Sequence, residues 1–405
     1  MSKFVKLSSI AELTVGFVGT MAKHYEDEGI PFLRSLNIKP FKIISDDMKY
    51  VSAEFSNSLS KSILHKGDVV IVRTGIPGTC CVVPAEYDGC NCSDVVIVHP
   101  NTELVNPHYL AAYINFWGQR QIQNNKVGAI QQHINVHSAE EMLIFLPDIT
   151  EQEKIAKTIV ALNGKIENNF SVCVELEAMA KTLYDYWFTQ FDFPDENGKP
   201  YCSSGGEMVW NDQLKRKIPK GWSAGQLSDI ANITMGQSPS GDTYNENGSG
   251  TIFYQGCTDF GTRFPVPRVY TSAPTRFAKA GDILMSVRAP VGTLNIAMED
   301  CCIGRGLAAL NSKFGSQLHL LYTLSGFKQL FDVMDGNGTT FGSITKDTLF
   351  EMKVVIPRRD QIKSFEEMVQ PIEQKIRITE QENRELTKLR DWLLPMLMNG
   401  QAAVE

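Results

Sequence analysis

The chain repeats itself, and this internal repeat limits its architecture more than any other feature. Residues 6–16 (KLSSIAELTVG) match 226–236 (QLSDIANITMG), 66–79 (KGDVVIVRTGIPGT) match 280–293 (AGDILMSVRAPVGT), and 144–147 (IFLP) match 354–357 (VVIP). The offsets of 220, 214 and 210 drift slowly and preserve the order of the segments, which indicates a duplication. Two copies are too few for a solenoid. The 405 residues therefore predict two similar domains, each followed by an appendage.

The first part of each copy predicts a sheet-rich domain. Short apolar runs at 69–72, 95–98 and 283–285 are typical of buried strands, and two of them directly follow a Gly-Asp turn. The stretches 109–122 and 318–331 predict single helices. The expected fold class is α+β, with a mixed or curled sheet in each domain.

The appendage of each copy has the periodicity of a long helix with a heptad seam. The first seam is Ile155, Ile159, Leu162, Ile166, Asn169, Cys173, Leu176, Ala180, Leu183 and Trp187. The second lies 210 residues later, at Phe365, Val369, Ile372, Ile376, Thr379, Asn383, Leu386, Arg390, Leu393 and Leu397.

Two long seams in the same phase predict that the helices pair with each other, because an isolated seam would expose much apolar surface. Ordinary amphipathic core helices remain the alternative. Both seams have a polar middle, at Asn169 in one and at Thr379 and Asn383 in the other, which can fix the register of the pair. Pro371 predicts a kink or a late helix start.

Composition restricts the partners and the compartment. The net charge of −7 argues against a protein whose whole surface is positively charged and binds nucleic acid non-specifically. Local basic grooves remain compatible with this charge. No secretory signal or membrane span is visible, and nine cysteines without export signals favour a reduced cytoplasmic protein. The cluster Cys80, Cys81, Cys90 and Cys92 lacks zinc-site spacing, so these residues are expected to be buried apolar side chains.

Motifs for catalysis are missing. The sequence contains no dinucleotide-binding glycine motif after a strand, no P-loop, no H-E-x-x-H and no G-x-S-x-G. His133 and His137 have the spacing of two metal ligands on a helix, but the surrounding residues are more typical of a turn entering a strand. An enzyme is therefore disfavoured, and no catalytic or metal-binding residue is predicted.

Several motifs of the second copy resemble one known family. They are GQSPS at 236–240, FYQG at 253–256, GDIL at 281–284, VRAPVG at 287–292 and IGRGL at 303–307. The first copy has GIPFLR at 29–34 and Gly67-Asp68 in the same order, and the linker ends with IPKGW at 218–222. Over nearly its whole length the chain resembles the DNA-specificity (S) subunits of type I restriction-modification enzymes. The first copy departs from the second at 74–77 and 93–95, which is consistent with two domains that read different DNA sequences.

The resemblance implies two target-recognition domains (1–150 and 221–357) separated by a pair of long antiparallel coiled-coil helices (151–190 and 358–400), with a linker at 191–220 and pseudo-twofold symmetry. It also implies a non-catalytic, cytoplasmic subunit that binds double-stranded DNA at a bipartite asymmetric site. Two methyltransferase (M) subunits would dock on the helices, and restriction (R) subunits would join them. S-adenosylmethionine, ATP and Mg would bind to these partners, and no cofactor would bind to this chain.

Candidate DNA contacts follow from this implied function, because Arg, Asn and Gln read base edges and Arg, Lys, Ser and Thr hold phosphates. The first domain contributes Arg34, Asn37, Lys42, Arg73, Thr74 and Gln131. The second contributes Gln237, Ser238, Ser240, Tyr244, Gln255, Arg263, Arg288 and Thr340. Helix pairing is assigned to Ile155, Ile159, Leu162, Ile166, Leu176, Leu183, Ile372, Ile376, Leu386 and Leu393.

The second domain can present a basic surface to DNA only if its arginines line one face. The five arginines concerned are Arg263, Arg268, Arg276, Arg288 and Arg305. The helices would act as a ruler, so deleting four residues from both should change the spacer of the DNA site. Two alternatives stay open: a duplicated coiled-coil protein-binding scaffold without DNA recognition, and a fused enzyme with an unrecognised site.

Overall fold

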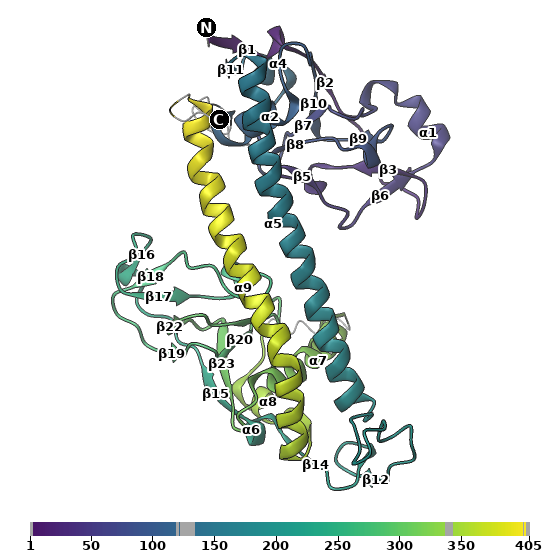
Figure 1. Ribbon diagram of the computed structural model, residues 1–405, viewed down its shortest axis with the longest axis vertical. Helices are drawn as coiled ribbons and strands as arrows, with labels where there is room; N and C mark the ends of the chain where they lie inside the picture. Colours follow the sequence, from purple (N-terminus) through teal and green to yellow (C-terminus); the bar gives the residue numbers. More distant parts are fainter. Residues whose placement is uncertain (1–2, 119–120, 122–133, 337–342, 400, 402–405) are drawn as a thin grey trace. The chain divides into compact units, whose positions relative to one another are not determined.

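A computed structural model describes residues 3–118, 121, 134–336, 343–399 and 401 (Figure 1). The chain divides into two compact units, and each is described by itself. Unit 1 comprises Met1–Ser171 and Thr379–Glu405, and unit 2 comprises Val172–Ile378. Each unit contains one sheet-rich repeat and part of each of the two long helices. The domain and linker boundaries proposed from the sequence stay predictions, because the two units cut across these helices.

Unit 1 contains a four-stranded antiparallel sheet in the order β2 (Ala11–Val15), β10 (Val95–Pro100), β7 (Val69–Val72) and β8 (Cys80–Val82). A second sheet has the order β6 (Lys49–Val51), β3 (Ile30–Leu33) and β9 (Asn91–Cys92), with β3 parallel to β9. Two smaller pairs are β1 (Lys3–Lys6) with β11 (Leu143–Leu146) and β4 (Ile38–Lys39) with β5 (Lys42–Ile43). The helices of this repeat are α1 (Ala53–Ser58), α2 (Pro107–Tyr113) and α4 (Val136–Glu140).

Unit 2 repeats the order of the four-stranded sheet and the parallel pair of the second sheet, but its second sheet has five strands instead of three and its described residues form no counterpart of the β4–β5 pair. Its four-stranded sheet has the order β15 (Ala231–Met235), β23 (Leu307–Ser312), β20 (Ile283–Ser286) and β21 (Leu294–Ile296). Its second sheet has the order β16 (Tyr244–Asn245), β18 (Tyr270–Thr271), β17 (Thr251–Tyr254), β22 (Cys301–Ile303) and β19 (Phe277–Ala278), with β17 parallel to β22. The pair β14 (Ser223–Gln226) and β24 (Lys353–Ile356) matches β1 and β11. Its helices are α6 (Leu227–Ile230), α7 (Gln317–Gly336) and α8 (Lys346–Phe350).

The shared topology confirms the predicted α+β class and the internal repeat. It also explains the unbroken apolar run of β7. Successive side chains of a strand point to opposite faces. Val69 and Ile71 lie in one buried cluster, whereas Val70 and Val72 lie in another, so both faces of this sheet are covered. Leu284 of β20 is likewise in a different cluster from Ile283 and Met285.

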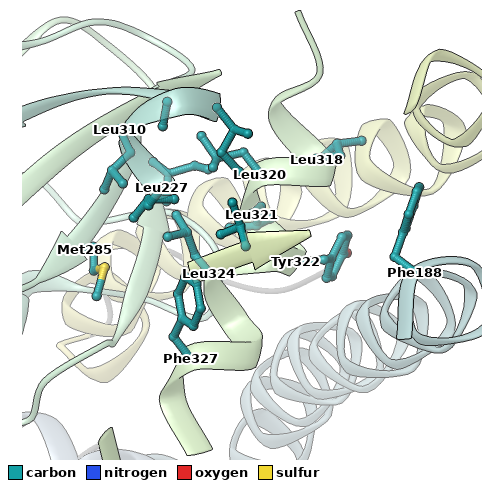
Figure 2. Close-up of a cluster of buried hydrophobic side chains, with 14 of the residues drawn as sticks. Phe188, Leu227, Met285, Leu310, Leu318, Leu320, Leu321, Tyr322, Leu324 and Phe327 are labelled. Carbon is teal, nitrogen blue, oxygen red and sulfur yellow. The ribbon is translucent and has the colours of Figure 1, made fainter. Parts of the chain in front are cut away.

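The helix α7 joins the sheet of unit 2 to the long helices. Figure 2 shows Leu320, Leu321 and Leu324 gathered beside sheet residues, while Tyr322 lies on another side of α7, nearer to Phe188. Phe188 belongs to a π-helical turn at Asp185–Thr189 that continues the first long helix. The ring of Phe188 meets the ring of His319 in α7 edge-on, with centroids 4.7 Å apart. Helix α7 therefore packs both on the sheet and on the end of the first long helix.

The two long helices are α5 (Ile149–Tyr184) and α9 (Arg359–Met398). Helix α9 continues through Pro371, so the late start expected there does not occur. Proline removes the hydrogen bond to the carbonyl four residues earlier, and this is residue Glu367, which is exposed and can bind water instead. All twenty seam residues of the two series are buried or half-buried.

Contacts between the helices show that they are antiparallel. Within unit 1, Arg390 Nη1 donates to Asn163 Oδ1 at 3.1 Å, and Asn169 Nδ2 donates to Glu382 Oε2 at 2.8 Å. Within unit 2, Cys173 lies against Ile376. The residue number rises along α5 as it falls along α9, which confirms the predicted antiparallel pair.

The linker between the repeats contains a hairpin formed by β12 (Met208–Asn211) and β13 (Arg216–Pro219). All nine cysteines are free thiols, and seven of them are buried, including the four between 80 and 92. Among the described residues, no group of three or more His, Cys, Asp or Glu is arranged to hold a metal ion. No helix in the described part of the chain is long and apolar enough to cross a membrane.

Candidate nucleic-acid interface

Polar side chains of unit 2 converge on residues 303–306, a segment that begins with the last residue of β22. The Gln237 N–H donates to Ile303 O at 3.0 Å, and the Arg305 N–H donates to Ser238 Oγ at 3.2 Å. Ser238 Oγ donates in turn to Gln255 Oε1 at 2.9 Å. Three segments far apart in the sequence thus place Gln237, Ser238 and Gln255 around Arg305.

Glycines allow this close approach. A Cβ on Gly236 would lie 2.2 Å from Gly304 O, and a Cβ on Gly306 would lie 2.7 Å from Gln255 O. Both contacts are far below van der Waals distance, so neither position accepts a side chain without moving the backbone. The glycines of the GQSPS and IGRGL motifs therefore serve the packing of this site.

Two further arginines flank the same segment. The Ile303 N–H donates to Arg276 O, and the Val287 N–H donates to Gly306 O, each at 2.9 Å, which places Arg276 and Arg288 beside residues 303–306. The side chains of Arg276, Arg288 and Arg305 are exposed and form no ion pair with any residue that the structure describes. We call these three residues the exposed arginine group.

The other two arginines of the five have internal partners. Arg268 pairs with Asp259 at 2.8 Å and with Glu246 at 3.5 Å. Arg263 is buried, and its guanidinium lies within ion-pair distance of Glu373 and Glu177. Arg263 therefore has almost no exposed surface for DNA, although the sequence suggested a contact there.

Tyr244 and Ser240 lie near this site. The hydroxyl of Tyr244 donates to Pro239 O at 3.0 Å, and its ring packs against Phe253 with centroids 4.8 Å apart. Partial burial raises the pKa of Tyr244, and the positive charge of Arg305 acts in the opposite direction. Ser240 is exposed.

The corresponding segment of unit 1, residues 92–95, has different chemistry. The Phe17 N–H donates to Cys92 O, and Thr74 Oγ1 donates to the Asp94 carboxylate. Two apolar side chains are exposed near this segment: Val18, at the position equivalent to Ser238, and Ile76, two positions after Thr74. Where unit 2 presents Arg305, unit 1 presents Asp94.

Arg34 and Asn37 of unit 1 are occupied internally. Arg34 Nη2 pairs with Asp47 Oδ2 at 3.0 Å, and hydrogen bonds from Lys49 and Arg34 lower the pKa of Asp47. Asn37 is fully buried: its Nδ2 donates to Ile44 O at 3.2 Å and to Asp46 O at 3.0 Å. In this structure Asn37 offers no surface to DNA.

The remaining candidates are divided between other roles and undescribed segments. Lys42 Nζ pairs with Glu167 of α5 at 2.8 Å, so this lysine contacts the helix. Arg73 Nε donates to Ile134 O at 3.2 Å. Gln131 and Thr340 lie outside the described residues. Arg276 and Arg305 were not among the residues assigned to DNA; their positive charge, and the Gly-Arg-Gly motif around Arg305, were the available signals.

Comparison with known proteins identifies the family. The model of the family described as type I restriction modification DNA specificity domain matches residues 2–177 and again residues 219–388. The chain therefore belongs to this family and contains two of its domains in tandem.

Relatives of the whole chain have the same description. A putative type I restriction enzyme MjaX specificity subunit from Methanocaldococcus jannaschii is 29% identical over 96% of this chain and 91% of the relative. The MjaIX specificity subunit from the same organism is 24% identical over 99% of this chain and 93% of the relative. The crystal structure of a type I restriction-modification S subunit from M. genitalium matches 98% of this chain and 96% of that chain, with a TM-score of 0.57 and 15% identity, and supports the fold alone.

Proposed function

We propose that this chain is the DNA-specificity subunit of a type I restriction-modification complex and that it reads a bipartite, asymmetric DNA site. The observation that carries the proposal is the exposed arginine group, which lies beside Gln237, Ser238 and Gln255 in a domain whose family occurs twice in the chain. Guanidinium and amide groups match base edges in the major groove, and guanidinium groups also neutralise phosphates. Because unit 1 presents Thr74, Asp94, Val18 and Ile76 instead, the two half-sites should differ in sequence.

The chain would supply recognition and no chemistry. Methyltransferase subunits, two in number, would bind S-adenosylmethionine and methylate an adenine in the site, and restriction subunits would use ATP and Mg. The assembly would work in the cytoplasm, where nine free thiols stay reduced. A net charge of −7 is compatible with this role, because a subunit held in a complex does not have to bind DNA unaided.

Genome methylation tests the proposal directly. Comparing the methylated motifs of the host with and without this gene should reveal one bipartite adenine motif, with an unspecified spacer, that is lost with the gene. The purified chain alone should transfer no methyl group. Turnover by the lone chain would favour a fused enzyme, and an unchanged set of motifs would remove the assignment.

The exposed arginine group can be tested by salt dependence. Each neutralised phosphate contributes about −0.9 to the slope of log K against log salt. The triple variant R276A/R288A/R305A, bound to the methyltransferase partner and to site DNA, should therefore show a slope smaller in magnitude by up to about 3. The matched control R268A removes a guanidinium that is already paired with Asp259 and Glu246, and its slope should stay close to wild type.

The alternative of a protein-binding scaffold without DNA recognition predicts a different outcome. In that case the complex would bind site DNA no better than the methyltransferase alone does, and the triple variant would match wild type at every salt concentration.

A further inference from the structure

Arg263 occupies an unusual position for an arginine. Its side chain is 4% exposed, and Nη2 lies 3.4 Å from Glu373 Oε2 of α9 and 3.7 Å from Glu177 Oε1 of α5. Nη2 also donates to the hydroxyl of Tyr322 in α7 at 3.1 Å. One guanidinium from the sheet-rich repeat thus contacts both long helices and α7 within unit 2.

The backbone that carries Arg263 is held firmly. Asn295 receives a hydrogen bond from the Gly261 N–H at 3.1 Å and returns one to Gly261 O at 3.0 Å. The Ile296 N–H donates to Arg263 O at 2.9 Å, and Phe264 is buried. We call residues 260–264 the docking loop of unit 2, since they connect the sheet to the helices.

Stability alone does not explain this arrangement. Arg263 Nε and Glu373 Oε2 are buried without a hydrogen bond among the described residues, and burial raises the pKa of Glu373. Buried ion pairs often contribute no more stability than apolar side chains of the same volume, because taking both charges out of water is costly. A buried charged cluster that contains polar atoms without hydrogen bonds is better suited to favouring one packing of the domain on the helices than to maximising the free energy of unfolding.

Unit 1 has a corresponding segment that contacts the long helices through different side chains. The 3-10 helix Ser35–Asn37 precedes Phe41 by four positions, just as the 3-10 helix Cys257–Asp259 precedes Arg263 by four. Residues 38–42, which lie in the hairpin of β4 and β5, are thus the counterpart of the docking loop in unit 1. Its Phe41 lies under the guanidinium of Arg390 of α9, 5.4 Å from the ring centroid, and Lys42 pairs with Glu167 of α5.

The helix residues in the two contacts can be compared position by position, because the two long helices are related by an offset of 210 residues. Arg390 donates to Asn163 in unit 1, and the position equivalent to Asn163 in α9 is Glu373, which contacts Arg263. The position equivalent to Arg390 in α5 is Ala180, which is fully buried. A guanidinium is therefore present in both contacts, but a helix supplies it in unit 1 and the docking loop supplies it in unit 2.

We propose that Arg263 is the positioning residue of the second recognition domain. We further propose that each domain is assigned to its own end of the helix pair by a combination of loop and helix residues: Arg263 with Ala180 at the equivalent helix position in unit 2, and Phe41 with Arg390 in unit 1. Exchanging the loops alone would bring two guanidiniums together at one end and leave none at the other. The orientation of each domain on the helices in turn sets how far apart the two half-sites are read. This last step rests on the proposed function.

The first experiment uses the full chain with its methyltransferase partner. Initial methylation rates are compared on DNA with the native spacer and with spacers one base pair shorter or longer. R263M should lower the ratio of native to altered spacer by about tenfold, and the control K279M, which removes an exposed lysine paired with Asp300, should leave the ratio unchanged. A loss of stability alone would lower all three rates equally, so an unchanged ratio in R263M would overturn the positioning role.

The second experiment rebuilds the contact of unit 1 in unit 2. By analogy with the contact of Arg390 and Phe41, A180R should bring a second guanidinium near Arg263, and because Ala180 is fully buried it should lower the thermal unfolding temperature or the yield of folded protein. The triple variant A180R/R263F/E373N copies the arrangement of Arg390, Phe41 and Asn163 and should recover the wild-type unfolding temperature to within a few degrees. Failure of the triple variant to improve on A180R would overturn the assignment of domains to helix ends.

The two experiments separate this inference from the proposed function. If the wild-type complex methylates no bipartite site, the proposed function fails, while the unfolding temperatures of A180R and of the triple variant still decide whether the docking contacts are specific.

Discussion

At the scale of single residues, the two copies show how a shared aspartate can acquire different partners. In unit 1, Asp68 Oδ2 accepts from the His65 N–H, and its Oδ1 lies 2.7 Å from His99 Nδ1. In unit 2, Asp282 Oδ2 accepts from the Lys279 N–H, and its Oδ1 accepts from Asn311 Nδ2 at 2.9 Å. The aspartate of the Gly-Asp turn therefore closes the turn in both copies, and only the copy with histidine can titrate near neutral pH.

His99→Asn should remove a pH dependence from unit 1. The hydrogen bond with Asp68 raises the pKa of His99, with a smaller contribution from the charges of Asp68 and Glu12, while burial opposes it. Because the pKa is raised in the folded state, the stabilisation is complete below the unfolded value of about 6.5 and is lost as pH rises through the folded value. The thermal unfolding temperature of wild type minus that of H99N should thus be larger at pH 5.5 than at pH 8.5.

The reciprocal variant is the control. Asn311→His places the histidine beside Asp282 and should introduce the same direction of pH dependence into unit 2. A difference between wild type and H99N that stays constant across this pH range would show that the charged form of His99 contributes nothing.

Single residues were also where sequence reasoning was least informative. Asn37 and Arg263 are polar residues in loops, so a role at the surface was a reasonable hypothesis, yet both are buried. The partners of Arg263, at Glu177 and Glu373, are 86 and 110 positions away in the chain. No local pattern carries that information, because such burial is decided by tertiary packing.

At the scale of elements, the long helices were predictable because their signal is local and periodic. A spacing of 3.5 residues over nine steps determines which side of a helix is buried, and all twenty seam positions avoid full exposure in the structure. The pairing of the strands was not predictable in the same way. The parallel neighbours β3 and β9, for example, are joined by a long excursion through β7 and β8, and nothing in either strand specifies its partner.

The polar middle of the seam has partners that only the structure could supply. Asn169 donates to Glu382 at 2.8 Å, and Asn383 Nδ2 donates to Ile166 O at 3.1 Å. An amide N–H group that donates in one register is left unpaired in any other, which costs about 1–3 kcal/mol where the group is buried. These contacts explain why polar residues interrupt an otherwise apolar seam, and they fix how the two helices can be shortened without losing register.

At the scale of the whole molecule, the repeat itself determined most of what could be inferred. Three matched segments with slowly drifting offsets led to two similar domains and two in-phase helices, and the four-stranded sheets of units 1 and 2 have equivalent strand orders. Function depended instead on family resemblance, because no periodicity distinguishes a domain that reads DNA from one that binds protein.

The idea that the helices measure the DNA spacer can now be tested with their register preserved. Removing residues 166–172 together with 378–384 deletes one heptad from each helix, and it takes out Ile166, Asn169, Glu382 and Asn383 at once, so no buried amide loses its partner. Seven residues correspond to ~10 Å of helix, or at most about three base pairs. The methylated motif of a host that carries this variant should keep both half-sites and have a spacer shorter by up to about three base pairs. Deleting only 166–172 leaves a mismatched pair and should lower methylation on every spacer, whereas an unchanged spacer in the double deletion would show that something other than the helices sets the distance.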